Sequence, residues 1–275
     1  MKNFLVLGGD LRQFYLTEKL KASGENTEVY FDRESNFSLE EVMEKSDIII
    51  CPIPFTKDKK NIFSTQGIEE LDIEKFLNCV TSRHTIWGGN IPQKIKNELK
   101  ERNISFFDFM ESEEVSIKNA VATAEGTIAE AIRLSTKNLH NSKCLVLGYG
   151  RCGKVLSQKL KALDAHVTVG GRSDEKLANA FAFGLETVNL KNLESAINKF
   201  DFIFNTVPEL IVGKNLIDLM KKDVVIIDIS SAPGGVDFDY CRVLGINASL
   251  CLGLPGKFSP ETSANILFDA IIKGL

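Results

Sequence analysis

Gly148, Gly150 and Gly153 stand directly after an apolar run at residues 145–147 and directly before an amphipathic helical pattern. The spacing G-x-G-x-x-G suits a dinucleotide. The first glycine makes the turn, the second lets backbone amides approach a pyrophosphate, and the third lets the helix pack closely on the strand. The helix N-terminus then faces the phosphates with unpaired N–H groups and the positive end of its dipole. We therefore predict a strand, a tight turn and a helix that bind a dinucleotide, with a glycine-rich packing turn as the alternative.

The second strand predicted in this part of the chain, at residues 166–170, indicates which dinucleotide binds. NAD-binding versions end this strand with Asp or Glu, which accepts a hydrogen bond from the ribose 2′-OH. Here the strand runs into Gly170 and Gly171, followed by Arg172 and Ser173. No carboxylate at this place repels a 2′-phosphate, and the planar guanidinium of Arg172 fits one. We predict NADP, with a solvated loop cation as the alternative role of Arg172.

The other predicted cofactor contacts come from the glycine turn and from later strand ends. The complete predicted set is Gly148, Tyr149, Gly150, Arg151, Cys152, Gly153, Gly171, Arg172, Ser173, Thr206, Val207, Pro208 and Ser230. Cys152 lies at a helix N-terminus, where the pKa of a thiol can fall. The alternative is that Cys152 is simply a small residue that fits a tight turn.

Composition sets the broad class. The 275 residues, of which 44% are hydrophobic and 25% charged, are enough for two ordinary domains with their own cores. A net charge of -4 gives no basic footprint, which argues against a nucleic-acid partner. No apolar run approaches the length of a membrane span, and no leader pattern follows Met1, so we expect a cytoplasmic protein. The six cysteines show no C-x-x-C pair and no histidine at ligand spacing, which argues against disulfides and a metal site.

Strand and helix patterns alternate through the first 110 residues. Strands are predicted at residues 4–9, 28–31, 47–54, 85–89 and 104–110, and helices at residues 10–22, 38–46, 67–79 and 91–102. Strands that alternate with helices predict a parallel, doubly wound sheet of flavodoxin-like or Rossmann-like type. Gly8 and Gly9 are followed by Asp10 and Leu11 without a third glycine, so we do not predict a second nucleotide site here.

A helix predicted at residues 119–138, with the Thr123 hydroxyl as its N-cap, joins the two domains. The rest of the second domain is predicted as helices at residues 190–200 and 214–221 and strands at residues 201–208, 223–230 and 246–252. A final helix, with Ser259 as N-cap and Pro260 at its first position, is expected to cross back to the first domain. The predicted fold is therefore α/β, with two doubly wound parallel-sheet domains, residues 1–118 and 119–275, and a cleft between them.

Several short motifs occur together over nearly the whole chain. They are GGDLRQ at 8–13, TAEG at 123–126, GYGRCGK at 148–154, NTVP at 205–208, PGGVDF at 233–238, and GLPGK at 253–257 followed by Ser259 and Pro260. In this order they resemble the family of the dipicolinate synthase A subunit. The resemblance implies an NADP-dependent oxidoreductase subunit that works with the flavoprotein-type B subunit of dipicolinate synthase. Its reaction would oxidise a dihydrodipicolinate-level intermediate to dipicolinate (pyridine-2,6-dicarboxylate) in the cytoplasm of the mother cell of a sporulating bacterium, and a homo-oligomer is expected.

A substrate with two carboxylates needs cations and hydrogen-bond donors. Ligands of open α/β sheets bind beyond the carboxyl ends of the strands. Arg12 follows the first strand and is the leading candidate for a carboxylate ligand. Lys257 and the hydroxyls of Ser230 and Ser231 come next.

A catalytic base is harder to find in the sequence. His84, His140 and His166 stand at the amino ends of their strands, so they are expected at the wrong end of the sheet. Glu125, predicted at a helix start, and Asp10 are the remaining candidates, with helix-dipole or capping roles as the alternative.

Two other functional classes stay open. A self-sufficient NADP-dependent dehydrogenase for a small keto or hydroxy acid would normally show a histidine near the end of the nucleotide domain, where this sequence has none. A non-enzymatic nucleotide-binding regulatory subunit would keep the glycine turn but would have no reason to place Arg12 and Lys257 at strand ends.

Overall fold

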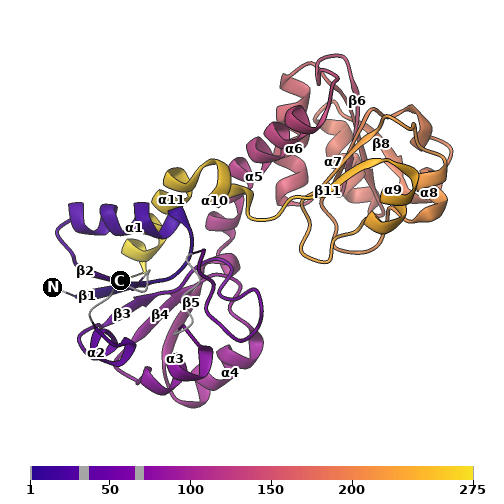
Figure 1. Ribbon diagram of the computed structural model, residues 1–275. Coiled ribbons are helices and arrows are strands. Elements are labelled where there is room, and N and C mark those ends of the chain that lie inside the picture. The colour runs from indigo at the N-terminus through magenta and orange to yellow at the C-terminus, as the bar shows by residue number, and fades with distance from the viewer. Residues whose placement is uncertain (1, 31–36, 66–70, 275) are drawn as a thin grey trace. The chain divides into compact units, whose positions relative to one another are not determined.

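The computed structural model describes residues 2–30, 37–65 and 71–274 (Figure 1). They form two compact units: Met1–Asn119 together with Ser259–Leu275 make the first unit, and Ala120–Phe258 make the second unit. Helix α5 (Glu113–Leu134) contributes its first part to the first unit and the remainder to the second. Within the described ranges no helix is long and apolar enough to cross a membrane.

The first unit contains a parallel sheet of five strands, as predicted. The strands are β1 (Asn3–Leu7), β2 (Asn26–Tyr30), β3 (Ile48–Ile50), β4 (Thr85–Gly88) and β5 (Ser105–Asp108). Their order is β2-β1-β3-β4-β5, the flavodoxin-like arrangement. The chain reverses its direction of winding beside β1, so the carboxyl ends of β1 and β3 border the place where such sheets bind ligands.

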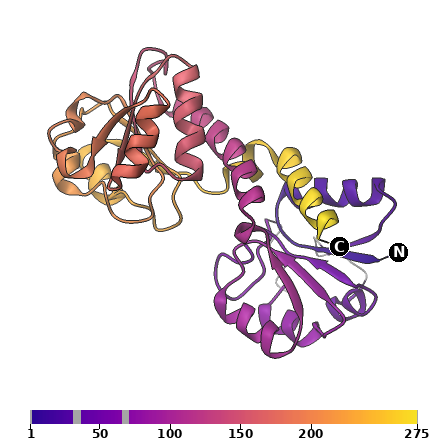
Figure 2. The same cartoon turned by 180° about the vertical axis from the view of Figure 1, so that it is seen from behind.

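Helices cover both faces of this sheet (Figure 2). One face carries α1 (Leu11–Ala22) and α11 (Pro260–Lys273), and the other carries α2 (Leu39–Glu44), α3 (Ile73–Cys79) and α4 (Gln93–Glu101). Side chains of β1 alternate between the two cores because the strand period is two. Phe4 and Val6 pack with α1 and α11, whereas Leu5 and Leu7 pack with the helices of the other face. The helix predicted at 67–79 begins at Ile73, and residues 67–70 lie outside the described ranges.

The second unit contains a parallel sheet of six strands. They are β6 (Lys143–Leu147), β7 (His166–Gly171), β8 (Glu186–Asn189), β9 (Phe202–Asn205), β10 (Val225–Asp228) and β11 (Asn247–Leu250). The order β11-β10-β9-β6-β7-β8 is that of dinucleotide-binding Rossmann domains. The point where the winding reverses lies between β6 and β9, directly beside the glycine turn.

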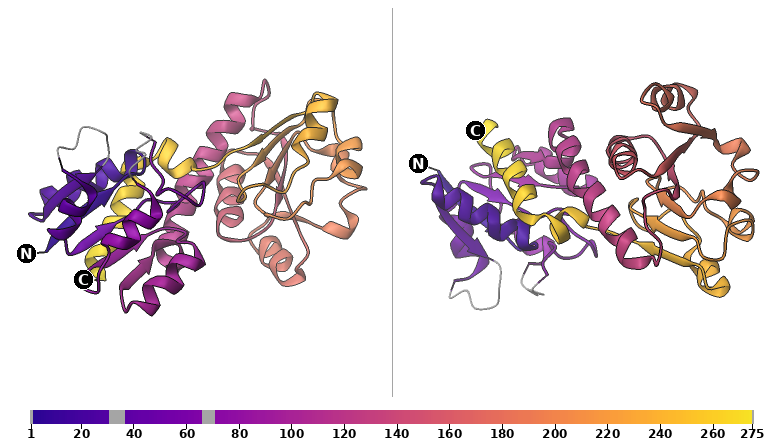
Figure 3. Two further views of the ribbon diagram at one scale, coloured as in Figure 1. Left: turned by 60° about the horizontal axis from the view of Figure 1, so that its bottom comes forward. Right: turned by 90° about the horizontal axis from the view of Figure 1, so that it is seen from above.

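Helices also cover both faces of the second sheet (Figure 3). They are α6 (Arg151–Ala162), α7 (Asp174–Ala182), α8 (Lys214–Asp218) and α9 (Phe238–Leu244). The short helix α10 (Leu254–Phe258) instead packs against α5 at Gly126. Along β6, Cys144 and Val146 pack with α6 and α7, whereas Leu145 and Leu147 pack with α8 and α9. The predicted α/β fold with two parallel-sheet domains is confirmed.

Three element predictions were wrong. The helix predicted at 119–138 begins at Glu113, because Ser112 caps it: the Ser112 hydroxyl accepts a hydrogen bond from Val115 N at 3.4 Å. Thr123 therefore lies in the middle of α5 and is not an N-cap. Residues 190–200 form two short 3-10 helices, η2 (Leu190–Asn192) and η3 (Ile197–Lys199), in place of one α-helix.

Four further elements of the second unit, α7, β8, α9 and α10, were not predicted. At the last helix Pro260 does occupy the first turn, but Ser259 makes no side-chain capping bond.

Candidate dinucleotide-binding site

The glycine turn has the geometry that its spacing predicts. Gly148 follows β6 with φ of 93°, and a Cβ at this position would lie 2.5 Å from Thr206 Oγ1. A Cβ on Gly153 would lie 2.2 Å from the carbonyl oxygen of Gly148. Both distances are far below van der Waals contact, so a side chain at either position would push α6 or the loop after β9 away from β6. Gly148 thus permits the turn and Gly153 permits the close packing of helix on strand.

Gly150 differs from its neighbours because the space beside it is open. An ideal Cβ on Gly150 meets no described heavy atom within 4 Å. Gly150 is also the N-cap of α6, without a side-chain capping bond, and the first turn of α6 has no acidic residue. The N-terminus of a helix carries the positive end of its dipole and directs backbone N–H groups toward an anion. Open space at this helix N-terminus fits a dinucleotide pyrophosphate.

The loop after β9 forms the neighbouring wall of the turn. Thr206 Oγ1 donates a hydrogen bond to Leu147 O at 2.9 Å, which ties this loop to the end of β6. Asn205 is fully buried, and its side chain both donates to Val207 O at 2.9 Å and accepts from Val207 N at 3.2 Å. These bonds fix the backbone at 205–207 beside Gly148.

A buried carboxylate that the sequence analysis missed holds the loop after β10. Asp228 is fully buried at the end of that strand. Its Oδ1 accepts hydrogen bonds from Ser230 N at 2.8 Å and Ser230 Oγ at 2.7 Å, and its Oδ2 accepts from Gly235 N at 2.7 Å. The predicted ligand Ser230 therefore already uses its hydroxyl proton within the protein. An acidic residue that ends an apolar strand just before small residues was the available signal.

Arg172 follows the end of β7, as predicted, but it has a partner. Its Nη2 lies 2.9 Å from Glu209 Oε2 and 3.1 Å from Glu209 Oε1, and the two side chains are 66% and 61% exposed. The sequence argument that no carboxylate faces a 2′-phosphate here was therefore wrong, because Glu209 arrives from the loop after β9. The neighbouring Ser173 caps α7 by accepting a hydrogen bond from Lys176 N at 3.3 Å.

The remaining turn residues have mixed environments. Burial raises the pKa of the Cys152 thiol, although Arg151 and Thr123 act in the opposite direction, which favours the alternative of a small residue that fits a tight turn. Tyr149 is only 4% exposed, and burial raises the pKa of its phenol. Arg151 and Pro208 are exposed.

The two candidates from the first unit bind each other. Asp10 is the N-cap of α1, and its carboxylate accepts hydrogen bonds from Arg12 N at 3.1 Å, Arg12 Nε at 2.8 Å and Arg12 Nη2 at 2.7 Å. Nη2 also donates to Ile53 O. Burial by itself would raise the pKa of Asp10, but the bonds and charge of Arg12 outweigh it and lower that pKa. Asp10 is thus held as a carboxylate, which suits a cap.

The other two catalytic candidates also form ion pairs. Glu125 lies in the middle of α5, not at a helix start, and pairs with Lys159 at 2.8 Å. Lys257 pairs with Glu130, which is 2% exposed and also binds Arg133 Nη2 at 2.7 Å. The Lys257 hydrogen bond, followed by that of Arg133, lowers the pKa of Glu130 against the opposing effect of burial.

The histidines lie where the sequence predicts. His84 precedes β4 and is buried, its ring accepting a hydrogen bond from Thr81 N at 2.9 Å, and burial lowers its pKa. His140 precedes β6 and lies 3.5 Å from Asp164, and His166 is the first residue of β7. None of the three follows a strand.

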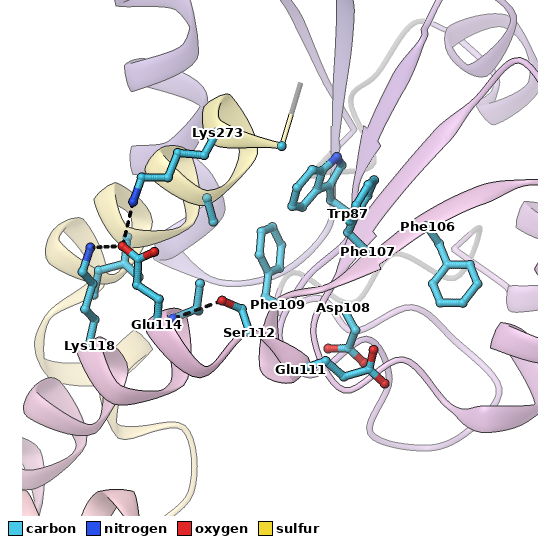
Figure 4. Close-up of a pocket in the computed structure, with 14 residues that line it drawn as sticks. Trp87, Phe106, Phe107, Asp108, Phe109, Glu111, Ser112, Glu114, Lys118 and Lys273 are labelled. Carbon is cyan, nitrogen blue, oxygen red and sulfur yellow. Dashed lines mark hydrogen bonds and ion pairs between the residues drawn. The ribbon is translucent and has the colours of Figure 1, made fainter.

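The first unit also contains a pocket of about 410 Å³ that includes none of the predicted site residues (Figure 4). It lies beside β5, η1 (Phe109–Glu111) and α11. Trp87 stacks on Phe107 with ring centroids 4.4 Å apart, and at the far end Lys118 and Lys273 both bind Glu114. Figure 4 also shows Ser112 and the carboxylates of Asp108 and Glu111, both of which pair with Lys96. Because the carboxylates at this pocket are bound to lysines, we do not assign the chemistry to it.

Comparison with known proteins decides the family. The model of the N-terminal domain of the dipicolinate synthase A subunit matches residues 3–110, and that of the NAD binding domain of D-isomer specific 2-hydroxyacid dehydrogenases matches residues 115–235. The dipicolinate synthase A subunit of Bacillus subtilis (strain 168) is 30% identical over 280 residues, which cover 98% of this chain and 94% of that protein. The chain belongs to the family of the dipicolinate synthase A subunit.

Solved structures of this family agree with the assignment. The crystal structure of the dipicolinate synthase A subunit from Bacillus halodurans matches with a TM-score of 0.90 and 29% identity, over 99% of this chain and 97% of that one. The crystal structure of the corresponding dipicolinate synthase chain from Bacillus subtilis matches with a TM-score of 0.83 and 28% identity, over 99% and 95%. This member of the dipicolinate synthase family therefore carries a dehydrogenase-like domain of the kind that binds a nicotinamide dinucleotide.

Proposed function

We propose that this chain is the NADP-dependent oxidoreductase subunit of a dipicolinate synthase. With the B subunit of that enzyme it would oxidise a dihydrodipicolinate-level intermediate to dipicolinate, in the mother cell of a sporulating bacterium. The observation that carries the proposal is the open N-terminus of α6 at Gly150, next to a strand end that presents Arg172. Membership of the family of the dipicolinate synthase A subunit supports a dihydrodipicolinate-level intermediate as the substrate.

Gly148, Gly150 and Gly153 and the first turn of α6 would hold the pyrophosphate, and Arg172 the 2′-phosphate. When bound, the nicotinamide supplies a hydride acceptor. Converting a dihydropyridine to a pyridine removes one hydride and one proton, and aromatisation makes the step downhill, so the reaction calls for no covalent nucleophile. This chain must therefore orient the substrate and release one proton.

The candidate residues of this chain do not include a free group that could accept this proton. Asp10, Glu125 and Glu130 are each bound to a cation, and no histidine follows a strand. General acid or base help contributes about 10² to 10⁴ in rate. We therefore propose that the B subunit completes the site, with Arg12 and Lys257 as candidate ligands of the substrate carboxylates.

Direct titration with NADP and NAD tests the cofactor assignment. A charge-assisted bond to phosphate is worth roughly 1.5 to 3 kcal/mol, so Arg172→Ala should weaken NADP by about ten- to a hundredfold and barely change NAD. Arg242→Ala is the control, because Arg242 is an exposed arginine of the same unit in an ion pair with Asp239 at 2.8 Å. Equal losses of NADP and NAD on removing Arg172 would refute the assignment.

Turnover tests the reaction and the partner. NADPH formation from a dihydrodipicolinate-generating system should be slow with the isolated chain and rise on co-expression with the B subunit. Full activity of the isolated chain would show that its own site is complete.

A further inference from the structure

The Arg172–Glu209 ion pair lies across the glycine turn, between the two strands that flank it. In the sheet, β7 and β9 are the two neighbours of β6. Arg172 follows β7 and Glu209 belongs to the loop after β9, whereas the glycine turn follows β6. A bond of 2.9 Å between these side chains must therefore span the carboxyl end of the middle strand.

The backbone that carries Glu209 is firmly held. Ile211 N and Val212 N both donate to Gly235 O, at 3.0 and 2.9 Å. Gly235 N in turn donates to the buried Asp228, and a Cβ on Gly235 would lie 2.4 Å from Glu209 O. The position of Glu209 is thus set by main-chain packing that ends in a fully buried carboxylate.

The backbone beneath Arg172 is held as well. Gly171 pairs with Asn189 of β8, and Ser173 caps α7. Both side chains of the ion pair are more than half exposed, so each can rotate into solvent while its backbone stays in place. The ion pair is therefore a weak contact between two exposed side chains whose backbone segments are firmly held.

We propose that Glu209 is a specificity-determining residue that competes with the 2′-phosphate of NADP for Arg172. This inference rests on the proposed dinucleotide site. A 2′-phosphate that binds Arg172 must replace the Glu209 carboxylate and then lie close to its negative charge. Glu209 thereby lowers the preference for NADP over NAD below the value that Arg172 alone would give.

Binding of 2′,5′-ADP and of ADP, measured by calorimetry, tests the proposal without turnover. The two probes differ in the 2′-phosphate and lack nicotinamide. Glu209→Gln should tighten 2′,5′-ADP by about three- to tenfold, from loss of an exposed ion pair and of charge repulsion. Affinity for ADP should change by less than about twofold.

Asp239→Asn is the matched control, because Asp239 is an exposed carboxylate that pairs with an arginine of the same unit at 2.8 Å. It removes the same charge and should leave both affinities within about twofold. In an Arg172→Ala background, Glu209→Gln should raise the affinity for 2′,5′-ADP by less than about twofold. The guanidinium for which Glu209 and the 2′-phosphate compete is then absent.

The outcomes separate the inference from the proposed function. If the wild-type chain binds 2′,5′-ADP but Glu209→Gln does not tighten it, or tightens ADP equally, Glu209 has no part in specificity. A full gain that persists without Arg172 would also overturn competition for the guanidinium. If the wild-type chain binds neither probe, the dinucleotide site itself is refuted.

Discussion

In each unit a glycine turn joins a strand to a helix, β1 to α1 in the first unit and β6 to α6 in the second. The two turns differ in whether a side chain caps the N-terminus of the helix. In the first unit Asp10 caps α1 with its own carboxylate. In the second unit Gly150 caps α6 without a side chain, and the space beside it is open. One N-terminus receives a carboxylate from its own chain, whereas the other has no side-chain cap and has open space for an external anion.

The point at which each sheet reverses its winding shows the same contrast. In the first unit Arg12 reaches from α1 to Ile53 O, just beyond β3, and Gln13 Nε2 donates to Leu7 O and Ile50 O, each at 3.3 Å. Buried side chains thus fill the place where such sheets bind ligands. A strand, a glycine turn and a helix therefore make an anion site only when no side chain of the turn supplies the anion.

Gly150→Asp should remove the difference between the two helix N-termini, because it gives α6 an aspartate cap like that of α1. The new carboxylate would face the phosphates, at a cost of about 2 to 4 kcal/mol at an effective dielectric between those of water and the interior. Affinity for NADP and for ADP should therefore fall by about 30- to 1,000-fold. Stability should change by only a few tenths of a kcal/mol, because Asp and Gly are both accepted as N-caps. Retained affinity in calorimetry would contradict the role of the open N-terminus.

Asp10→Ala tests the same difference in the first unit, by removing the side-chain cap from α1. It removes the cap of α1 and leaves Arg12, whose side chain is 8% exposed, without its carboxylate. The loss of stability should be about 2 to 3 kcal/mol, between that of a lost cap and that of a broken buried pair. Hydrogen exchange of peptides from α1 should accelerate, whereas peptides from α6 should not change. Equal acceleration in both helices would mean that the effect is not local.

Arg12→Lys separates structure from substrate binding. Lysine keeps the charge but loses the fork that binds the Asp10 carboxylate and Ile53 O together, so we expect a loss of about 1 kcal/mol in stability. If Arg12 also binds a substrate carboxylate, turnover with dihydrodipicolinate should fall while NADP affinity stays unchanged. Normal turnover would leave Lys257 as the carboxylate ligand to test.

The smallest expected effect is a pH dependence in the first unit. Arg12 lowers the pKa of Asp10 in the folded chain, so the carboxylate contributes stability above the ordinary pKa of Asp, near 3.9. That contribution is lost as the pH falls through the lower folded pKa. The stability difference between wild type and Asp10→Asn, from urea unfolding, should therefore shrink below about pH 4. A difference that grows on acidification would show that the pKa is raised.

Patterns local in the chain determined much of this protein. Alternating apolar strands and helices predicted both parallel sheets, and the spacing of Gly148, Gly150 and Gly153 predicted a turn whose geometry is observed. Such features depend on neighbours a few residues away, so their signals lie within one stretch of sequence. Local reasoning failed at the start of α5, where a Ser112 cap was overlooked, and at β8, which is short and half exposed.

Contacts between distant segments were decided only by the tertiary structure. Asp10 and Arg12 are two residues apart, but whether they bind each other or a ligand depends on burial and on Ile53, which lies past another strand. Glu209 meets Arg172 only because β7 and β9 are both neighbours of β6, although the two residues are 37 positions apart. The sequence determined which charges exist. Strand order decided which charges meet, because it brings the ends of distant strands to one edge of the sheet.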